Sequence, residues 1–424
     1  MFTRLHTPKG TRDHLPDEVK RYRYIEDELR ENFKLWGYQE IRSPTIEFVE
    51  TLSTGVGPEL VDAMFKFQDF DGKILALRAE MTAPVARIVT TRMTAMPEPI
   101  RLFYVSNTFR YSQSYIERGR EFWQAGVELL GCNTSEADGE ILSLLVSSLR
   151  KLGLTEVRID VGHAGILKDL LNATGLDEEK RGILQNLLAY RDESRLEKFM
   201  DQNNFSSILR EAFLQLSSCR RLNDVSSVSL SSSEYGKTDD HLRNLLEIKE
   251  ALCDYGIDNL VFFDFSLTRK IEYYTGMVFE ASVPNLGQPL GGGGRYDDFI
   301  ERFGNLRLPA TGFALEIEKC LQALTAQGFK IPEKQKAKIL ISSKFRDVAI
   351  KAVKVFRDAG VVALLDVMES VEKKIINYAK LAGIDYVVFV GSSFKKPAKI
   401  YDVGSDVYRN IMIETFLQGV GGQP

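Results

Sequence analysis

Ionisable and polar side chains recur inside apolar, strand-like stretches of this chain. Glu80 lies in "LRAEMT", Gln124 and Glu128 lie in "FWQAGVE", and Tyr273 and Tyr274 lie in "LTRKIEYYTG". Because residues four apart on a strand share a face, Gln124 and Glu128 are expected to point into one cavity. Carboxylates bind an ammonium group, and amides and tyrosine hydroxyls add hydrogen bonds. The pattern predicts a pocket for a small zwitterion, with surface ion pairs on an ordinary sheet as the alternative.

Arginines accompany these residues. Arg110, Arg118 and Arg120 surround a short polar loop in the stretch 109–128, and Arg269 precedes the two tyrosines. A guanidinium group binds a carboxylate or a phosphate through two parallel N–H bonds. The arginines therefore suit either the acid group of an amino acid or the phosphates of a nucleotide.

Other short motifs carry less chemistry. The glycine run 291–294 lacks the GxGxxG spacing of a dinucleotide-binding turn, so it indicates a close approach of the backbone to a ligand, or a bend between strands. His163 has no partner at ligand spacing and is expected to be structural. The four cysteines are scattered, which argues against a disulfide framework and against a zinc site. We therefore expect no cofactor and no metal.

Composition and charge limit the class of protein. The 424 residues include 44% hydrophobic and 27% charged residues, and the net charge of −4 gives no overall case for nucleic-acid binding. The segment 331–424 carries about +5, for which a solvated lysine-bearing surface is favoured over RNA binding. No apolar run is long enough for a membrane span, and residues 1–18 do not resemble a signal peptide. A cytoplasmic location is expected.

Hydrophobic periodicity indicates the elements that must position the polar residues. Helical spacing is found over 17–36, 83–93 and 135–154. Strand-like patterns are found, in chain order, over 38–48, 99–111, 120–131, 156–166, 260–267 and 272–283, and the stretch 310–324 passes from strand to helix. A hairpin is expected over 64–80, with its turn at 69–72.

Local signals refine these boundaries. Pro44 interrupts the first strand, Ser135 is a candidate N-cap and Gly153 is a candidate C-cap of the helix between them. The strand 156–166 is expected to enter a turn. The serine-rich stretch 226–233 is expected to be a surface loop.

Two domains are expected, over 1–328 and 336–418, joined by a polar linker. The first combines an antiparallel sheet with helices and carries a helical insertion over about 167–255, which makes its class α+β. The second alternates strands and helices, and we expect a small α/β unit with a largely parallel sheet.

Five motifs in a fixed order give a specific resemblance. They are "KGTRDHLPDE" (9–18), "YQEIRSPTIE" (38–47), "FRYSQSYIERGREFWQAGVE" (109–128), "RKIEYYTGMVFEA" (269–281) and "ATGFALEIEKC" (310–320). In that order they resemble the N-terminal signature, motif 1, motif 2, the histidine-specific motif and motif 3 of class II histidyl-tRNA synthetases and of their paralogue, the regulatory subunit of ATP phosphoribosyltransferase. The C-terminal unit resembles the anticodon-binding domain. The resemblance implies a class II synthetase-like fold and a dimer formed through the motif 1 region.

Departures from the synthetase motifs concern ATP. In synthetases the arginine of motif 2, here Arg110, is followed two residues later by a glutamate that helps to hold ATP, and this chain has Ser112. Motif 3 of the synthetases has a glycine and an arginine where this chain has Glu316 and Lys319. A lysine keeps the charge of arginine but loses its bidentate fork, and a glutamate beside a triphosphate repels it.

By contrast, the residues that the resemblance places around histidine are retained. They are Glu80, Thr82, Arg110, Gln124, Glu128, Arg269, Tyr273 and Tyr274. Two further departures are Lys270, where a glycine is usual, and Ala79, where a proline is usual. The balance favours the regulatory subunit, and a histidyl-tRNA synthetase remains the alternative because Arg269 is kept.

For the regulatory branch, the resemblance implies a protein that performs no catalysis itself. Its partner would be the short-form catalytic ATP phosphoribosyltransferase, at the first step of histidine biosynthesis, in a hetero-oligomer. Histidine would act as the effector through the retained pocket, and tRNA is not an expected ligand.

Overall fold

The computed structural model describes residues 5–111, 119–189, 192–221, 224, 238–264, 266–267, 273–284, 286–332, 336–368 and 371–420. The chain divides into two compact units, Met1–Ile331 and Pro332–Pro424. The polar loop at 112–118, with Arg118, and the serine-rich stretch at 226–233 lie outside the described residues. Within those ranges, no helix is both long and apolar enough to cross a membrane.

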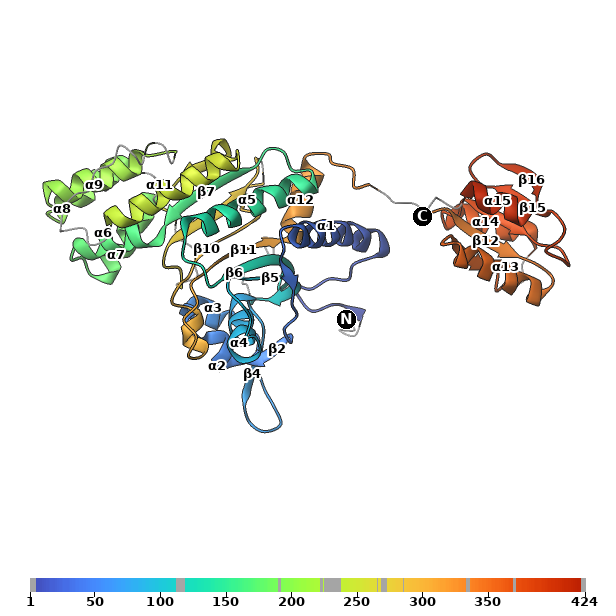
Figure 1. The fold of residues 1–424 in the computed structure, drawn as a ribbon, viewed down its shortest axis with the longest axis horizontal. Coiled ribbons are helices and arrows are strands. Elements are labelled where there is room, and N and C mark those ends of the chain that lie inside the picture. Colours follow the sequence, from blue (N-terminus) through green and yellow to red (C-terminus); the bar gives the residue numbers. More distant parts are fainter. Residues whose placement is uncertain are drawn as a thin grey trace. The chain divides into compact units, whose positions relative to one another are not determined.

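An eight-stranded sheet lies at the centre of the first unit (Figure 1). In spatial order its strands are β1 (Gln39–Glu40), β5 (Ile100–Phe109), β6 (Glu121–Leu130), β11 (Ala310–Glu316), β10 (Gly291–Arg295), β9 (Met277–Ser282), β7 (Arg158–His163) and β8 (Val261–Phe263). Neighbours are antiparallel except at the two edges, where β1 pairs with β5 and β8 pairs with β7 in parallel. The expected antiparallel sheet is confirmed.

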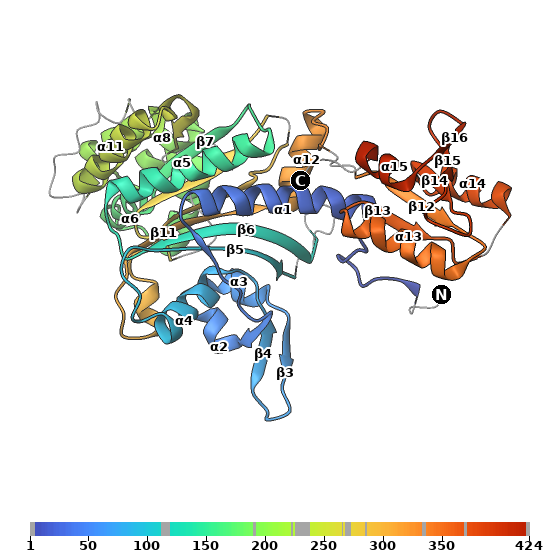
Figure 2. The same ribbon diagram turned by 45° about the vertical axis from the view of Figure 1, so that its right-hand side comes forward.

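The two faces of this sheet are covered differently. On β6, Ala125, Val127 and Leu129 join the core formed with α1 (Pro16–Leu35), α5 (Ser135–Leu152) and α12 (Ile317–Ala326). The alternate residue Leu130 joins a second core with α4 (Thr82–Arg92). Figure 2 shows α1 and α5 on one side of β5 and β6, and α4 on the other. Residues at even positions of β6 therefore face the α4 side.

The first helix follows from its apolar spacing. Tyr22, Ile25, Leu29 and Phe33 are buried, whereas Val19 is 39% exposed and does not contribute to the core. Pro16 begins the helix, where its missing N–H costs nothing, and the chain then turns through a glycine of positive φ at position 37. Helix α1 thus confirms the predicted amphipathic helix over 17–36.

The caps of α5 differ from expectation at one end. Thr134, not Ser135, is the N-cap, and its side chain accepts from the backbone N–H of Ala137. The hydroxyl of Ser135 instead donates to Glu247 at 2.7 Å. Gly153 ends the helix with φ 98°, as predicted. Both Thr and Ser are favourable N-caps, so residue type alone does not decide between these two neighbours.

The predicted insertion is helical. It comprises α6 (Ala164–Ala173), α7 (Glu178–Ala189), α8 (Glu193–Gln202), α9 (Ser207–Ser218) and α11 (Thr238–Asp254). The predicted turn after the strand 156–166 is wrong, because α6 begins directly after β7. His163 caps this helix, since its Nδ1 accepts from the backbone N–H of Gly165 at 3.1 Å. Its ring also stacks on His241, with centroids 4.5 Å apart, which agrees with a structural role.

The glycine run is a strand and not a connection between strands. Strand β10 lies between β9 and β11 in the middle of the sheet. A Cβ on Gly293 would lie 1.8 Å from the carbonyl oxygen of Gly312 on β11, so the close approach of the two backbones requires glycine. The run was expected to let the backbone approach a ligand or to form a bend, whereas the structure places the backbone of the neighbouring strand against it.

A small second sheet carries the predicted hairpin. Its strands are, in order, β2 (Ile46–Phe48), β4 (Ile74–Leu77) and β3 (Lys66–Gln68), and the chain turns at 69–72. The short helices α2 (Val49–Ser53) and α3 (Pro58–Asp62) follow β2. Figure 2 shows β3 and β4 extending away from the larger sheet.

The second unit is a mixed sheet with helices, which corrects the expected largely parallel one. In order its strands are β13 (Val362–Leu365), β12 (Lys338–Ser342), β14 (Tyr386–Phe389), β15 (Ala398–Asp402) and β16 (Val407–Ile411), and its helices are α13 (Arg346–Asp358), α14 (Glu372–Leu381) and α15 (Ile413–Val420). Strand β12 pairs in parallel with both β13 and β14, whereas the β14–β15 and β15–β16 pairs are antiparallel. The four residues 403–406 between β15 and β16 are too few for a parallel crossover.

Candidate ligand-binding pocket

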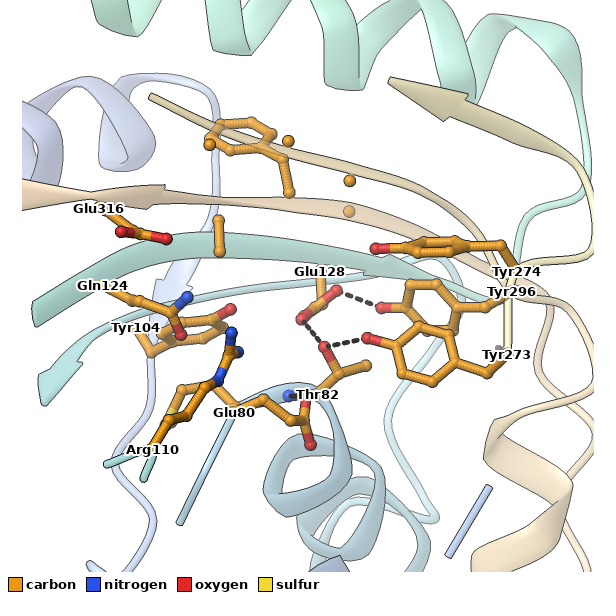
Figure 3. A pocket seen from close by; sticks show the side chains of 17 residues that line it. Glu80, Thr82, Tyr104, Arg110, Gln124, Glu128, Tyr273, Tyr274, Tyr296 and Glu316 are labelled. Carbon is orange, nitrogen blue, oxygen red and sulfur yellow. Dashed lines mark hydrogen bonds between the residues drawn. The ribbon is translucent and has the colours of Figure 1, made fainter. Parts of the chain in front are cut away.

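Six separate segments of the first unit line one cavity of about 70 Å³ (Figure 3). The lining residues are Glu80, Met81, Thr82, Tyr104, Arg110, Gln124, Glu128, Tyr273, Tyr274, Tyr296 and Glu316, with backbone from 291–293 and 312–314. Seven of the eight residues predicted from the sequence are in this set, and Arg269 lies outside the described residues. A cavity of this size has room for several water molecules or for a small polar ligand.

The strand periodicity explains how β6 contributes. Gln124 and Glu128 lie on the α4 side of the sheet, where both are buried and both line the cavity. Two neighbouring glycines leave room for the side chains of Glu128 and Tyr104. A Cβ on Gly312 would lie 2.1 Å from Glu128 Oε2, and a Cβ on Gly126 would lie 2.4 Å from the hydroxyl oxygen of Tyr104. The shared face of Gln124 and Glu128, predicted from their spacing, is confirmed.

The Glu128 carboxyl group accepts hydrogen bonds from two hydroxyls, one of which accepts a hydrogen bond from a third. Tyr296 donates to Glu128 Oε2, Thr82 donates to Oε1 at 3.1 Å, and the Tyr273 hydroxyl donates to Thr82 Oγ1 at 3.2 Å (Figure 3). Burial raises the pKa of Glu128 to about 8 and outweighs the hydroxyl bonds, which lower it, while the nearby Glu80 carboxylate raises it further. The group is thus a desolvated acid held in one orientation, which suits recognition of a single cation.

Glu80 also has a structural task. Its carboxylate accepts the backbone N–H of Thr82 at 2.6 Å and that of Ala83 at 2.8 Å, which satisfies the first donors of α4. Burial raises its pKa, and these two backbone bonds and Arg110 lower it. Glu80 therefore fixes the helix end that presents Thr82 to Glu128, in addition to placing a second carboxylate at the cavity.

Arg110 lies on the side of the cavity occupied by Gln124 (Figure 3). Its Nε donates to the carbonyl oxygen of Ala79 at 2.7 Å, and its guanidinium carbon lies 5.3 Å from the ring centre of Phe122. Glu128 lies with the hydroxyls of Tyr273, Tyr274 and Tyr296 at one end of the cavity, and Arg110, Gln124 and Glu316 lie at the other. A small ligand with both a cationic and an acidic group can find a partner for each in this cavity.

Four of the named lining residues escaped the sequence analysis, and three of them, Tyr104, Tyr296 and Glu316, are polar. Tyr104 and Tyr296 present hydroxyls, and burial raises the pKa of each well above the ordinary tyrosine value, so both remain neutral donors. Glu316 was identified only as a departure from motif 3, not as a lining residue. The tyrosine that directly follows strand β10 in "GGGGRYDDF" is the sequence signal that could have identified Tyr296.

Glu316 and Lys319 form an ion pair at the Gln124 end. Glu316 lies opposite Gln124 on β11 and is the last residue before α12. Its carboxylate lies 3.3 Å from Lys319 Nζ, and the same ammonium donates to the carbonyl oxygen of Pro289 at 3.0 Å. Both side chains are almost fully buried. The lysine charge is therefore balanced by a carboxylate inside the protein, and Lys319 is not among the residues that line the cavity.

Comparison with known proteins was made with the whole chain. The sequence profile of the family described as "Histidyl-tRNA synthetase" matches residues 10–320. The ATP phosphoribosyltransferase regulatory subunit of Halothermothrix orenii is 34% identical over 400 residues, covering 94% of this chain and 95% of that protein. The histidine–tRNA ligase of Thermococcus kodakarensis is 33% identical over 412 residues, covering 94% of each.

A solved structure agrees with these relatives. The structure described as an ATP phosphoribosyltransferase regulatory subunit/histidyl-tRNA synthetase from Bacillus halodurans is 30% identical, with a TM-score of 0.79, and the match covers 92% of this chain and 98% of that one. These matches confirm the predicted class II synthetase-like α+β fold, with a main antiparallel sheet and a small C-terminal mixed sheet. The two kinds of relative are about equally similar, so identity alone does not choose between them.

Proposed function

Because the chain belongs to the histidyl-tRNA synthetase family, we propose that it is the family's non-catalytic branch, the regulatory subunit of ATP phosphoribosyltransferase. The observation that carries the proposal is the Glu316–Lys319 ion pair. A phosphate-binding cation must be available to the ligand, whereas Lys319 is neutralised by a carboxylate three residues away. Glu316 also places a negative charge at the cavity, where it opposes a triphosphate.

The pocket in this proposal binds histidine without activating it. Glu80 and Glu128 hold the ligand's ammonium or imidazole group, and the acid group lies toward Arg110 and Gln124, with Arg269 as a further candidate from the sequence motif. The Thr82, Tyr273 and Tyr274 side chains complete the binding site. Recognition of both ends by charge explains why a pocket so rich in ionisable groups is kept in a protein that makes no adenylate.

The partner in this proposal is the short-form catalytic subunit of ATP phosphoribosyltransferase, which joins ATP to phosphoribosyl pyrophosphate. The regulatory subunit is required for this first step of histidine biosynthesis and transmits feedback inhibition by histidine, in a cytoplasmic hetero-oligomer. Histidine can regulate the complex only if it binds the active and inhibited states with different affinity. Charging of tRNA is not part of the proposed function.

A homodimer through the motif 1 region is part of the proposal. One face of the small sheet exposes Ile46 and Phe48 of β2 by 46% and 44%, and Phe67 of β3 by 40%. Phe48 and Phe67 both lie opposite Leu75 of the central strand β4, so their side chains form one apolar row. A row of this kind favours contact with a second copy of the chain. Sedimentation velocity of the wild type and of Phe48→Glu tests this contact.

The alternative is a histidine–tRNA ligase, favoured by the relatives of that name at 33% identity. Pyrophosphate exchange dependent on histidine separates the two functions, because only a ligase forms histidyl-adenylate. The regulatory proposal predicts no exchange above background. Robust exchange would establish the ligase.

A further inference from the structure

We propose that Arg78 is a positioning residue of the pocket, which fixes Arg110 so that the pocket prefers ligands with a free carboxylate. The inference rests on the proposed function, because that function assigns the ligand's acid group to the side of Arg110. Arg78 itself is not among the residues that line the cavity. It therefore acts on the ligand only through its neighbours.

The guanidinium group of Arg78 joins two segments that are far apart in the sequence. The side chain is 5% exposed. Its Nε donates to the carbonyl oxygen of Asn107 at 2.7 Å, and one terminal nitrogen donates to Asn107 Oδ1, also at 2.7 Å. The other terminal nitrogen donates to the carbonyl oxygens of Ser43 and Pro44, at 2.9 Å and 3.2 Å. One buried side chain thus links the chain before β2 to the end of β5.

The backbone of Arg78 makes the same connection. Its N–H donates to the carbonyl oxygen of Thr45 at 3.0 Å, and its carbonyl oxygen accepts the N–H of Phe109 at 2.9 Å. The next carbonyl oxygen along the chain, that of Ala79, accepts Arg110 Nε at 2.7 Å. Because Ala79 follows Arg78 and Arg110 follows Phe109, both partners of this last bond are held in place by contacts of Arg78.

The chemistry of arginine suits this task. The acceptors of the Arg78 side chain named above are uncharged oxygen atoms. A planar fork with five donors can hold several such oxygens at fixed angles, which neither a lysine nor an apolar side chain can do. The relative position of the segments 43–45, 78–80 and 107–110 therefore depends on Arg78.

A fixed Arg110 accounts for a preference for an acid group. A guanidinium group that is already ordered beside the ligand's carboxylate loses little conformational freedom on binding. Without Arg78, the segment 107–110 and Ala79 can shift relative to each other, and the ligand must order Arg110 itself. Binding then weakens for a ligand that has a carboxylate and changes little for a ligand that lacks one.

Calorimetric titration of the full-length protein with histidine and with histidinol tests the inference. Histidinol keeps the ammonium and imidazole groups and has a hydroxymethyl group in place of the carboxylate. The wild type should bind histidine more tightly than histidinol. Arg78→Met should bind histidine about tenfold more weakly, the low end of the effect of losing a charged hydrogen bond, and should bind histidinol as the wild type does. The ratio of the two affinities is the readout, because a general disturbance of the fold weakens both.

Further variants separate positioning from support of the fold. Arg110→Met should remove the preference for histidine, and adding Arg78→Met to it should lower the ratio no further, because the two residues act through one contact. Asn107→Ala removes one acceptor of Arg78 and should give a smaller loss of the ratio, which tests the inference even if Arg78→Met does not fold. Arg87→Met, which breaks the ion pair with Glu47 on β2, is the matched control and should leave the ratio unchanged.

Equal weakening of both ligands in Arg78→Met, or a further fall of the ratio in the double variant, would show that Arg78 supports the fold and does not position Arg110. A wild type that binds histidine and histidinol equally would also overturn the inference, since the acid group would then not be recognised at Arg110. No binding of histidine by the wild type would overturn the proposed pocket itself.

Discussion

The Lys319 ammonium group lies 3.3 Å from the Glu316 carboxylate, across the junction of β11 and α12. These are the two positions at which the sequence departs from the ATP-binding motif 3 of the synthetases. With Glu316 where the synthetases have a glycine, the cation at position 319 has a carboxylate partner three residues away, and both side chains are almost fully buried. The pair marks the end of the pocket at which ATP recognition is expected to be lost.

The first prediction concerns ATP. Wild-type protein should show no measurable binding of ATP, whereas the double variant Glu316→Gly with Lys319→Arg should gain weak binding, because it removes the repelling carboxylate and restores a bidentate fork. Fluorescence titration with an ATP analogue measures the gain, and histidine affinity measured alongside shows whether the pocket is intact. Equal ATP binding by wild type and double variant would mean that this pair does not control nucleotide access.

A second prediction concerns the carboxyl group of Glu128, which is proposed to hold the ligand's ammonium or imidazole group. Glu128→Gln should weaken histidine binding by about 10- to 100-fold, the effect of losing a charged hydrogen bond worth about 1.5–3 kcal/mol. Calorimetry at pH 8 gives the affinity, and Glu197→Gln, on an exposed helix surface, is the matched control. If both variants bind as the wild type does, Glu128 is not part of the binding site.

Some of this site was predictable and some was not. The period of two along β6 was enough to place Gln124 and Glu128 on one face. The sequence does not state which strands become neighbours, so the positions of Tyr104 on β5 and Glu316 on β11 next to these residues emerge only from the sheet order. The capping of α4 by Glu80 was missed because the same carboxylate also suits a ligand.

The fold shows the same limit. Apolar periodicity predicted α1, the hairpin at 64–80 and the helical insertion, since each depends on residues near in sequence. Strand direction in the second unit was predicted wrongly, although "YDVGSDVY" at 401–408 carries the Gly and Asp of a tight turn that implies an antiparallel pair. Asp406 in this turn has a φ of 57°, in the left-handed region that Asp tolerates in tight turns.

A third prediction follows from the titration of Glu128. Its pKa is about 8 in the folded protein and 4.5 in an unfolded chain, so between these values the folded state keeps a proton that the unfolded state loses. The free energy of unfolding should therefore fall by about 1.4 kcal/mol per pH unit from this group as the pH rises from 5 to 8. Urea unfolding followed by tryptophan fluorescence reports on the first unit, which contains both tryptophans, Trp36 and Trp123.

The comparison for this prediction is Glu128→Gln, which has no group to titrate. Its stability relative to the wild type should increase steadily over the same pH range. If the unfolding free energies of the two proteins changed with pH in parallel, Glu128 would already be ionised at pH 5 in the folded state. That result would contradict a pKa raised by burial.

A fourth prediction concerns the support of the sheet. Arg295 on β10 and Asp138 on α5 form a buried ion pair, with Arg295 Nε 2.9 Å from the Asp138 carboxylate. This pair links the strand to the helix. Arg295→Met should lower the free energy of unfolding by about 3–5 kcal/mol, because it leaves Asp138 as a buried charge without its partner. Arg195→Met removes the exposed partner of Asp192 and should cost less than about 1 kcal/mol. A similar loss of unfolding free energy in the two variants would show that the buried Arg295–Asp138 pair contributes no more to stability than the exposed Arg195–Asp192 pair.

The measurement that tests the central claim most directly is the rate of phosphoribosyl-ATP formation by a short-form catalytic subunit, with and without this protein. The account predicts that the two proteins co-purify, that the mixture is faster than the catalytic subunit alone, and that histidine slows it again. Glu128→Gln should keep the activation and lose most of the inhibition by histidine, because assembly does not need the pocket. The regulatory function would be contradicted if the two proteins formed no complex, the rate did not rise, and this protein charged tRNA with histidine.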